Sequence, residues 1–536
     1  MLLSFVFPAS PCFASPLNAP PLQLPLSTGN LSTADRLYAK EFRFEGNQVF
    51  TDAELAGVVA SYTGREISGE ELEEARRAVT MYYVDRGYIN SGAVLPEQPI
   101  AGGVITMRIT EGVLTGMRIS GNRWLRKSYI KGKLERWAAA PLNMNRLKEG
   151  LQLLRQDANV SQVNAELKPG AVPGESYLNI RVQDPDPFRF AIQVDNDRPP
   201  SVGADEITLL ASDRNLTGHS DPLDVTYGIA EGGNEGWRFS DFNNESASYM
   251  FPVTVYDTTL RLYGSKNDFS IIEKPFEAIN VFSESYRAGA TLRQPLYQTP
   301  NDEFAMSVTF ERRYSKAFVG GAAFDFSGTG TTNGITEISA LRIAQEWTDR
   351  NQDHVLALRS TFSVGLDAFG ISDADPKRNG EFFAWLGQGQ YVQRLFNTPN
   401  QLVLRSDVQL SPDPLLSLEQ FTLGGPDSVR GYRVNQVVAD QGADVSGELR
   451  LPVLFNHRGE AMLQFAPFCD FGGAWNTLDH TPDPTAIWSA GCGLLFTPNH
   501  HVNAQLYWGY AFKNIRTPDN DLQDLGLTFK VTVDAF

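Results

Sequence analysis

From residue 187 onward, apolar and polar residues alternate with a period of two, and no segment there has the 3.6-residue period of an amphipathic helix. The alternating segments are roughly 9 to 12 residues long, and they are separated by alternately short turns and long loops rich in Gly, Asn and Asp. About sixteen such segments fit into this stretch. The pattern therefore predicts a transmembrane antiparallel β-barrel of about 16 strands over residues 186–536.

The last alternating segments show most clearly which environment suits each face of a strand. In VNAQLYWGYAF one face is apolar, and the other carries Asn503, Gln505 and Gly509. The segment QLVLRSDVQL likewise places Arg405 and Asp407 on a single face. A soluble β-sandwich also alternates, but it rarely lines its enclosed face with charged side chains. One face therefore suits lipid and the other suits a polar interior, which favours a barrel.

Ahead of the barrel, the order strand, helix, helix, strand, strand occurs twice, over residues 41–112 and 113–185. Both copies place a Gly-Asn turn after the first strand, in EFRFEGNQVF and in MRISGNRWL. Ser68 and Glu71 form a capping-box pattern that predicts the start of the longer helix in the first copy. Asn143 is placed to cap the corresponding helix of the second copy. The repeat predicts two small α+β domains.

The N-terminal residues resemble an export signal. Residues 1–14 contain an apolar run that ends in small side chains, as a secretory signal peptide does, although the usual basic start is missing. A proline-rich linker follows over residues 15–40. No segment approaches the ~20 apolar residues of a transmembrane helix. A membrane-spanning form of this chain therefore has to cross the bilayer with strands.

Composition excludes several classes of function. The net charge of −17 argues against a nucleic-acid partner, since binding to phosphates needs clustered Lys and Arg. Three cysteines give no disulfide framework, and a bridge between Cys469 and Cys492 stays undecided. The sequence contains no H-E-x-x-H, G-x-S-x-G or G-x-x-x-x-G-K-[ST] motif. We therefore predict no enzymatic activity, no cofactor and no metal.

Two motifs inside the barrel pattern carry candidate chemistry. The stretch GGPDSVRGYR places Arg430 at the tip of a glycine turn, and Asp470 interrupts a mostly apolar strand 40 residues later. Asp470 shares one strand face with Gln464, Ala466 and Phe468, so its carboxylate points into the polar interior, where an arginine could reach it. A solvated turn arginine and an ordinary lumen aspartate would give the same pattern, and this alternative stays open. The candidate loop residues are Gly424, Gly425, Val429, Arg430, Gly431 and Tyr432.

These features together resemble the two-partner-secretion transporters, the TpsB class that includes haemolysin and filamentous-haemagglutinin exporters. The most specific likeness is VRGY preceded by Gly424 and Gly425, and Phe468, Asp470 and Gly472 match the companion barrel-strand motif. Weaker likenesses are NLTGHSD at residues 215–221 and GELRLP at residues 447–452. The two repeated modules look like POTRA domains.

The resemblance implies a function and its partners. The POTRA domains would capture a large β-helical exoprotein, unfolded in the periplasm, by adding its strands to exposed sheet edges. The exoprotein would then leave through the barrel, in the outer membrane of a Gram-negative bacterium. Outer-membrane lipid would surround the barrel, and the barrel-assembly machinery would insert it. The VRGY loop would fold back into the lumen, where Arg430 pairs with Asp470.

Two other functions use similar parts. An outer-membrane protein insertase would hand strands into lipid, but such proteins carry more POTRA modules than the two seen here. A porin would not need these modules. The chain also departs from the family pattern: the proline-rich residues 15–34 match poorly the helix that plugs the pore in many members. Phe536 suits a C-terminal insertion signal but falls out of phase with the outward residues before it.

Overall fold

The computed structural model of the protein describes residues 31, 35–99, 102–231, 237, 243–273, 280–325, 332–372, 375, 377–478, 480–517 and 521–535. The predicted signal peptide, most of the predicted linker and Phe536 lie outside these residues. The chain forms two compact units. The first comprises Met1–Gly116, Ala139–Met144 and Lys168–Tyr177, and the second comprises Met117–Ala138, Asn145–Leu167 and Leu178–Phe536.

The first module has the predicted helices and sheet, with one additional pair of strands. Its main sheet has the order β2-β5-β4, and β1 pairs with β3. Strand β1 lies in the last residues of the predicted linker. The capping box of Ser68 and Glu71 is present at the start of α2, as predicted. The elements are β1 (Arg36–Ala39), β2 (Glu41–Glu45), α1 (Asp52–Val58), η2 (Ala60–Tyr62), β3 (Arg65–Ser68), α2 (Gly69–Asp85), β4 (Gly92–Val94) and β5 (Val104–Thr110).

The second module repeats this plan with the sheet order β6-β8-β7. Its helices bury Ile130, Leu134 and Leu147 completely. The elements are β6 (Val113–Ser120), α3 (Lys127–Glu135), α4 (Met144–Arg155), β7 (Gln162–Pro169) and β8 (Glu175–Gln183).

An acidic residue directly after the last strand of each module holds the Gly-Asn turn. The Glu111 carboxylate accepts hydrogen bonds from the backbone N–H groups of Gln48 and Val49 at 2.7 and 2.8 Å. Asp184 accepts them from residues 123, 124 and 125 at 2.6–2.8 Å. Both modules therefore use a carboxylate at the same position, directly after the last strand, to accept hydrogen bonds from the backbone N–H groups of the turn.

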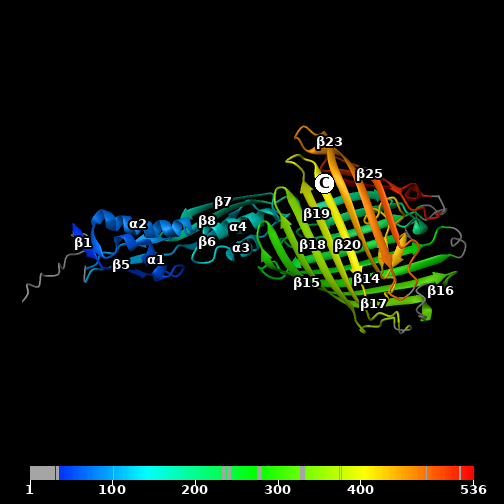
Figure 1. The fold of residues 1–536 in the computed structure, drawn as a ribbon, viewed down its shortest axis with the longest axis horizontal. Coiled ribbons are helices and arrows are strands. Elements are labelled where there is room, and N and C mark those ends of the chain that lie inside the picture. The colour runs from blue at the N-terminus through cyan, green and yellow to red at the C-terminus, as the bar shows by residue number, and fades with distance from the viewer. Residues whose placement is uncertain are drawn as a thin grey trace, which may run out of the picture. The chain divides into compact units, whose positions relative to one another are not determined.

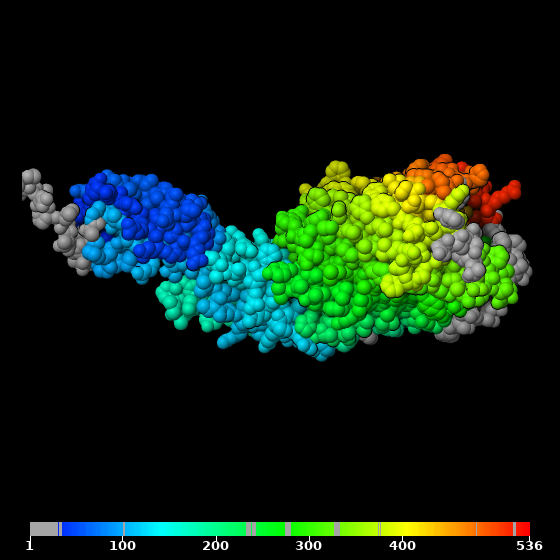
Figure 2. All heavy atoms as spheres, turned by 90° about the horizontal axis from the view of Figure 1, so that it is seen from below, coloured from blue at the N-terminus to red at the C-terminus, as the bar shows by residue number. Residues whose placement is uncertain are grey.

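Sixteen strands among the described residues form one closed antiparallel barrel (Figure 1). The last of them, β27, pairs with the first, β9. On the face that Figure 2 draws, the atoms of the barrel wall form a closely packed outer surface. The two-residue β16 (Ala322–Ala323) is an addition to β15. The strands are β9 (Phe188–Asp195), β10 (Glu206–Asp213), β11 (Leu223–Ala230), β12 (Asn243–Pro252), β13 (Thr259–Ser270), β14 (Val281–Gln298), β15 (Asp302–Val319), β17 (Ile335–Arg350), β18 (His354–Gly365), β19 (Phe383–Arg394), β20 (Gln401–Leu410), β23 (Gln441–Phe455), β24 (Ala461–Trp475), β25 (Ala486–Asn499), β26 (Val502–Ala511) and β27 (Leu527–Asp534).

The two faces of the barrel wall differ as the alternation predicts. Phe471, Trp508 and Tyr510 are exposed on the outside, whereas Asp470 and Glu448 are buried on the inside. Apolar side chains on the outer face suit lipid, and polar side chains on the inner face suit a lumen. Among the described residues, no α-helix has the length and hydropathy needed to span a bilayer.

Several strands are longer than the predicted 9 to 12 residues. Strands β14 and β15 have 18 residues each. The end of this hairpin carries polar cross-strand pairs, Glu284 opposite Lys316 and Ser285 opposite Ser315. Such pairs stabilise a hairpin in water, so the ladder continues beyond the apolar band.

The barrel has a short-turn end, with turns such as residues 253–258 and 299–301, and a long-loop end. The connection from β20 to β23 belongs to the long-loop end and contains a small hairpin, β21 (Phe421–Leu423) and β22 (Val437–Ala439). This connection, residues 411–440, carries the VRGY motif and is called the inner loop below.

Candidate functional site

The inner loop packs against the inside of the barrel wall. Its residues Leu423, Val429 and Val437 form a buried apolar cluster with Ala474 of β24 and Ile487 of β25. Burial of these side chains stabilises the folded-back position of the loop by the hydrophobic effect. The hairpin therefore presents its tip to the inner faces of β23 to β26.

Two glycines make the turn that aims the tip. Gly424 and Gly425 have φ angles of +105° and +93°, which side chains other than glycine rarely adopt. A Cβ atom at Gly424 would lie 2.2 Å from the carbonyl oxygen of Arg433. The Ser428 hydroxyl accepts a hydrogen bond from the Gly424 N–H at 2.9 Å. This compact turn places Arg430 at the wall.

The structure brings the candidate residues Arg430 and Asp470 together. Arg430 is 1% exposed and Asp470 is 0% exposed. The guanidinium donates through Nε to Oδ2 and through Nη2 to Oδ1, both at 2.8 Å, and the backbone N–H of Arg430 donates to Oδ2 at 3.0 Å. This is the bidentate geometry in which an arginine binds a carboxylate most strongly.

A second strand supplies partners that the sequence analysis missed. Arg430 Nη1 contacts the carboxylate of Glu448, and Nη2 donates to the Ser446 hydroxyl at 2.9 Å. Glu448 also accepts from Arg450 Nε at 2.8 Å and from the Tyr507 hydroxyl at 3.2 Å. Ser446 and Glu448 are two positions apart on β23 and therefore point to the same face. Counting strand faces, as for Asp470, could have placed both side chains in the interior.

Aromatic rings complete the pocket around the guanidinium. Its Cζ atom lies 3.6 Å from the ring centroid of Phe468 and 4.9 Å from that of Tyr507. Cation–π attraction is strongest where the groups are desolvated, as they are here. The aromatic residue of the strand motif is therefore a platform for the arginine.

Glycines on both sides allow the loop backbone to touch the wall. Gly431 has a φ of +87°, and a Cβ atom there would lie 2.7 Å from the carbonyl oxygen of Gly509 in β26. A Cβ at Gly509 would in turn lie 2.8 Å from Gly431 Cα. A Cβ at Gly472 would lie 2.7 Å from Leu423 and 3.0 Å from Val429. Any side chain at Gly431 or Gly509 would push the loop from the wall.

Tyr432 and Arg433 attach the loop beyond its tip. The Tyr432 hydroxyl donates to the carbonyl oxygen of Trp488 at 3.1 Å and accepts from the Lys513 N–H at 3.0 Å. Arg433 donates to Asp524 at 2.6 Å through Nη2 and to Glu273 at 2.8 Å through Nη1. Asp524 belongs to the short helix η7 (Leu522–Leu525), which precedes β27.

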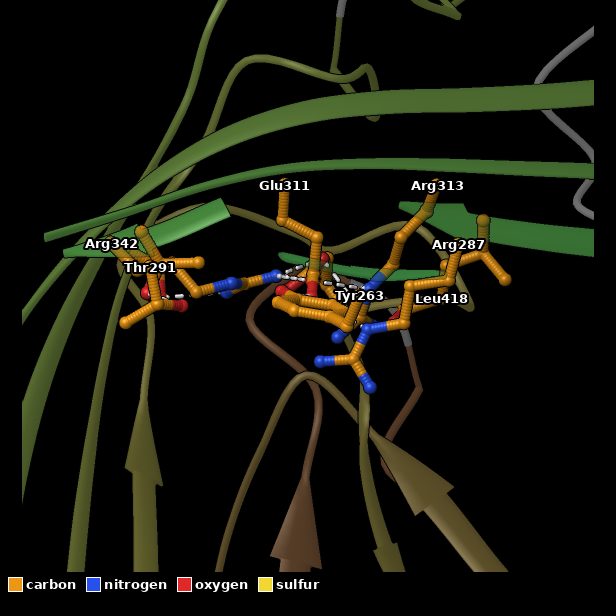
Figure 3. A network of polar contacts seen from close by, with 10 residues as sticks. Tyr263, Arg287, Thr291, Glu311, Arg313, Arg342 and Leu418 are labelled. Carbon is orange, nitrogen blue, oxygen red and sulfur yellow. Dashed lines mark hydrogen bonds and ion pairs between the residues drawn. The ribbon is translucent and has the colours of Figure 1, made fainter. Parts of the chain in front are cut away.

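The inner loop has a third attachment to the wall, at β15 and β17, which the sequence pattern did not predict. Glu311, 1% exposed, accepts from Arg287, Arg313 and Arg342 at 2.5, 2.8 and 3.1 Å. Figure 3 shows these side chains and Tyr263 converging on its carboxylate. Arg342 also binds Glu419 of the inner loop at 2.7 Å, and Arg313 contacts the Leu418 carbonyl oxygen. The part of the inner loop before β21, residues 411–420, is called the first limb below. It is held to this arginine cluster through Leu418 and Glu419.

The inner loop therefore spans the lumen between separate sectors of the wall. Beside its tip lies a cavity of about 140 Å³, lined among others by Arg405, Asp427 and Lys530. This volume is comparable with a cavity that accommodates one benzene molecule.

The cysteines and possible metal ligands lie apart from this site. Cys469 and Cys492 are free thiols on β24 and β25, where Cys469 faces Ala490 and Cys492 faces Pro467. Within the described ranges, no group of three or more His, Cys, Asp and Glu side chains is arranged to hold a metal ion.

Comparisons with known proteins agree on one family. The family described as "Haemolysin secretion/activation protein ShlB/FhaC/HecB" matches residues 174–496, and the ShlB-type POTRA domain matches residues 37–112. The outer membrane transporter CdiB of Dickeya dadantii (strain 3937) is 23% identical over 488 residues, which are 88% of this chain and 82% of that protein.

Two further comparisons extend the likeness. The heme/hemopexin transporter protein HuxB of Haemophilus influenzae (strain 86-028NP) is 22% identical over 476 residues, 84% of this chain and 79% of that protein. The solved structure of CdiB from Escherichia coli has a TM-score of 0.70 at 21% identity and covers 97% of this chain and 94% of that one. It shows the same fold.

The family match spans more than half of the chain, and it confirms the predicted resemblance, barrel fold and outer-membrane location. It also favours export over the insertase and porin alternatives, and identifies a transporter rather than an enzyme. The chain therefore belongs to the ShlB/FhaC/HecB family of haemolysin secretion/activation proteins, the TpsB transporters that export partner exoproteins across the outer membrane of Gram-negative bacteria.

Proposed function

We propose that this transporter captures an unfolded exoprotein in the periplasm on the sheet edges of its POTRA-like modules and exports it through the barrel, with the inner loop closing the lumen until cargo arrives. The buried contact between Arg430 and Asp470 carries this proposal. A loop with so many polar attachments is a stable resting state. Because these attachments are hydrogen bonds and ion pairs, water or cargo can replace them when the loop moves.

Sheet edges support the capture step. In the order β6-β8-β7, strand β7 has one neighbouring strand among the described residues, and its eight residues are long enough to pair with an extended segment. Addition of a strand to such an edge uses backbone hydrogen bonds and makes little demand on sequence. This suits a large β-helical exoprotein whose segments arrive unfolded.

The attachments of the inner loop support the closing step. The tip binds β23 and β24, Arg433 binds η7, and Leu418 and Glu419 bind the arginines of β15 and β17. These attachments hold the loop across the lumen, in the path that an exported polypeptide would take. Export then requires at least the tip to leave the wall.

Secretion by an Arg430→Ala variant tests the proposal. The transporter is co-expressed with its partner exoprotein, and exoprotein released into the medium is measured. We expect release to change at least tenfold, because loss of one partner of a buried ion pair costs about 3–5 kcal/mol and so removes the closed resting state of the loop. Glu448→Gln should have a smaller effect, since the Arg430–Asp470 pair remains.

Arg359→Ala is the matched control, because Arg359 also lies on a barrel strand but contacts its acidic neighbour only at 3.9 Å. Heat-modifiable migration and surface protease protection show whether each variant has inserted as a folded barrel. Normal secretion by correctly inserted Arg430→Ala would disprove the proposed role of the pair.

A further inference from the structure

A crevice of about 490 Å³ lies at the short-turn end of the barrel, between the helices of the second module, the turn between β12 and β13, and the last residues of β14. All of its lining residues belong to the second compact unit. Its lining includes Arg136, Trp137, Arg146, Tyr256, Pro295 and Leu296.

Ion pairs fix the helices beside this crevice. Lys133 and Arg136 both bind the Asp257 carboxylate in the turn between β12 and β13, Arg136 through Nη2 at 2.7 Å. Arg136 also donates to Gln298 at 2.9 Å, and Gln156 donates to the carbonyl oxygen of Pro300 at 2.8 Å. These contacts hold α3 and α4 against the rim and preserve the crevice.

The tryptophan of the crevice is held in place by α4. A Cβ atom at Gly150 would lie 2.5 Å from the Trp137 ring, so the ring rests directly on the helix backbone. The Arg136 guanidinium lies 5.2 Å from the centroid of the same ring. An indole that is fixed on one side and open to the crevice on the other is suited to an amphipathic ligand.

The opposite wall continues the lipid-facing surface of the barrel. Leu296 is 59% exposed and Tyr256 is 61% exposed, and Leu292 is exposed further along β14. The short-turn end is the periplasmic end, because the chain enters the barrel there from the POTRA-like modules. Tyr and Trp are enriched where the apolar band meets the headgroups. The crevice therefore opens toward the periplasmic leaflet.

Charge is strongly uneven between the two modules. Residues 113–185 contain 12 Lys and Arg against 6 Asp and Glu, whereas residues 41–112 contain 6 against 12. The basic module is the one attached to the barrel rim, in a chain whose net charge is −17. Basic side chains near a bilayer surface are attracted to anionic lipids by about 1 kcal/mol each.

We propose that this crevice binds an anionic phospholipid of the periplasmic leaflet. Its phosphate would lie near the guanidinium groups of Arg136 and Arg146, and an acyl chain would follow the exposed side chains of Leu296 and Leu292. The apolar wall distinguishes this ligand from a free phosphate ion. The exposed Leu292 and Leu296, which continue from the crevice along the lipid-facing side of β14, distinguish this ligand from cargo, which passes through the lumen. The bound lipid would fix the second module relative to the membrane.

Native mass spectrometry of the full-length protein, released from nanodiscs of mixed phosphatidylglycerol and phosphatidylcholine, tests this proposal. We expect one phosphatidylglycerol to be retained in preference to phosphatidylcholine. Arg146→Gln should lower that retention about five-fold, as expected for one basic residue. Lys148→Gln removes the same charge from an exposed site two residues away on α4, outside the crevice lining, and should leave retention unchanged.

Three results would overturn the proposal. Equal retention of the two lipids would show that binding does not depend on an anionic headgroup. Equal losses of retention in Arg146→Gln and Lys148→Gln would show that the lipid is not bound in this crevice. Displacement of the lipid by excess inorganic phosphate would mean that the crevice binds a free anion. Leu296→Asn gives an independent reading, because it should weaken lipid retention while every basic residue stays in place.

Discussion

Arg430 determines the charge balance of the inner loop. Its guanidinium binds two carboxylates, and one of these, Glu448, has Arg450 as a further cation. Without Arg430, Asp470 would be buried beside a second carboxylate, which is costly in a region shielded from water. Lysine would be a poor replacement because it lacks the planar fork that binds Asp470, Glu448 and Ser446 together.

The contact between Gly431 and Gly509 makes a residue-scale prediction. In Gly509→Ala the new methyl group would lie 2.8 Å from the Gly431 backbone, so the tip should separate from β26. We expect the open fraction of the channel in planar lipid bilayers to rise severalfold, because the folded-back position is strained. Gly447→Ala is the control, since its Cβ atom would lie 3.6 Å from the nearest side chain. Equal currents from the two variants would contradict the prediction.

At the scale of elements, alternation and capping signals predicted the barrel faces and the start of α2, because both depend on neighbours in sequence. The same counting placed Asp470 on the inner face. The contacts of Arg313 with Leu418 and of Arg342 with Glu419 were beyond this reasoning. Each joins residues 77 or more positions apart, and face-counting says which way a side chain points but not what meets it.

The arginine cluster gives a prediction about the first limb of the inner loop. Arg342→Ala removes the 2.7 Å contact with Glu419 but leaves Arg313 beside the same carboxylate. We expect a smaller rise in the bilayer open fraction than Arg430→Ala causes. The double variant should show additive changes in the free energy of opening, because the two attachments share no partners. A coupling energy above about 1 kcal/mol would show that the limb and the tip detach as one body.

The Gly-Asn turn of the second module gives a pH prediction. Although burial alone would raise it, hydrogen bonds from the N–H groups of Leu125, Arg123 and Trp124 lower the pKa of Asp184. The unfolded chain therefore binds the proton more tightly, and this stabilisation is complete above the unfolded pKa of about 3.9. It is lost as pH falls through the lower folded value.

Hydrogen exchange in the full-length protein measures this effect. Protection of the three turn amides should fall below about pH 4 in the wild type, after correction for the intrinsic exchange rate. In Asp184→Asn, which cannot ionise, protection should be lower at neutral pH and should lack this acid-dependent fall. The turn held by Glu111 in the first module is an internal reference for the variant. An unchanged pH profile in Asp184→Asn would assign the effect to another group.

At the scale of the whole molecule, the polar interior holds the inner loop against the wall. The outer wall is apolar and stable in lipid, so the barrel can stay rigid while its contents rearrange. The inner loop is attached at β15 and β17, at β23 and β24, and at η7, which lie in different sectors of the closed sheet. We therefore expect the lumen to become wide enough for an extended polypeptide when the loop leaves the wall, without any change in the strand pairing of the barrel.

A disulfide between the loop and the wall tests this movement directly. A Cβ atom at Gly472 would lie 3.0 Å from a Val429 methyl carbon, close enough for cysteines at both positions to form a bridge. With Cys469 and Cys492 replaced by serine, we expect Val429→Cys/Gly472→Cys to stop exoprotein release when oxidised and to recover when a reductant is added. Each single-cysteine variant controls for the substitutions themselves. Undiminished release from fully cross-linked transporter would mean that cargo passes while the loop tip remains on the wall.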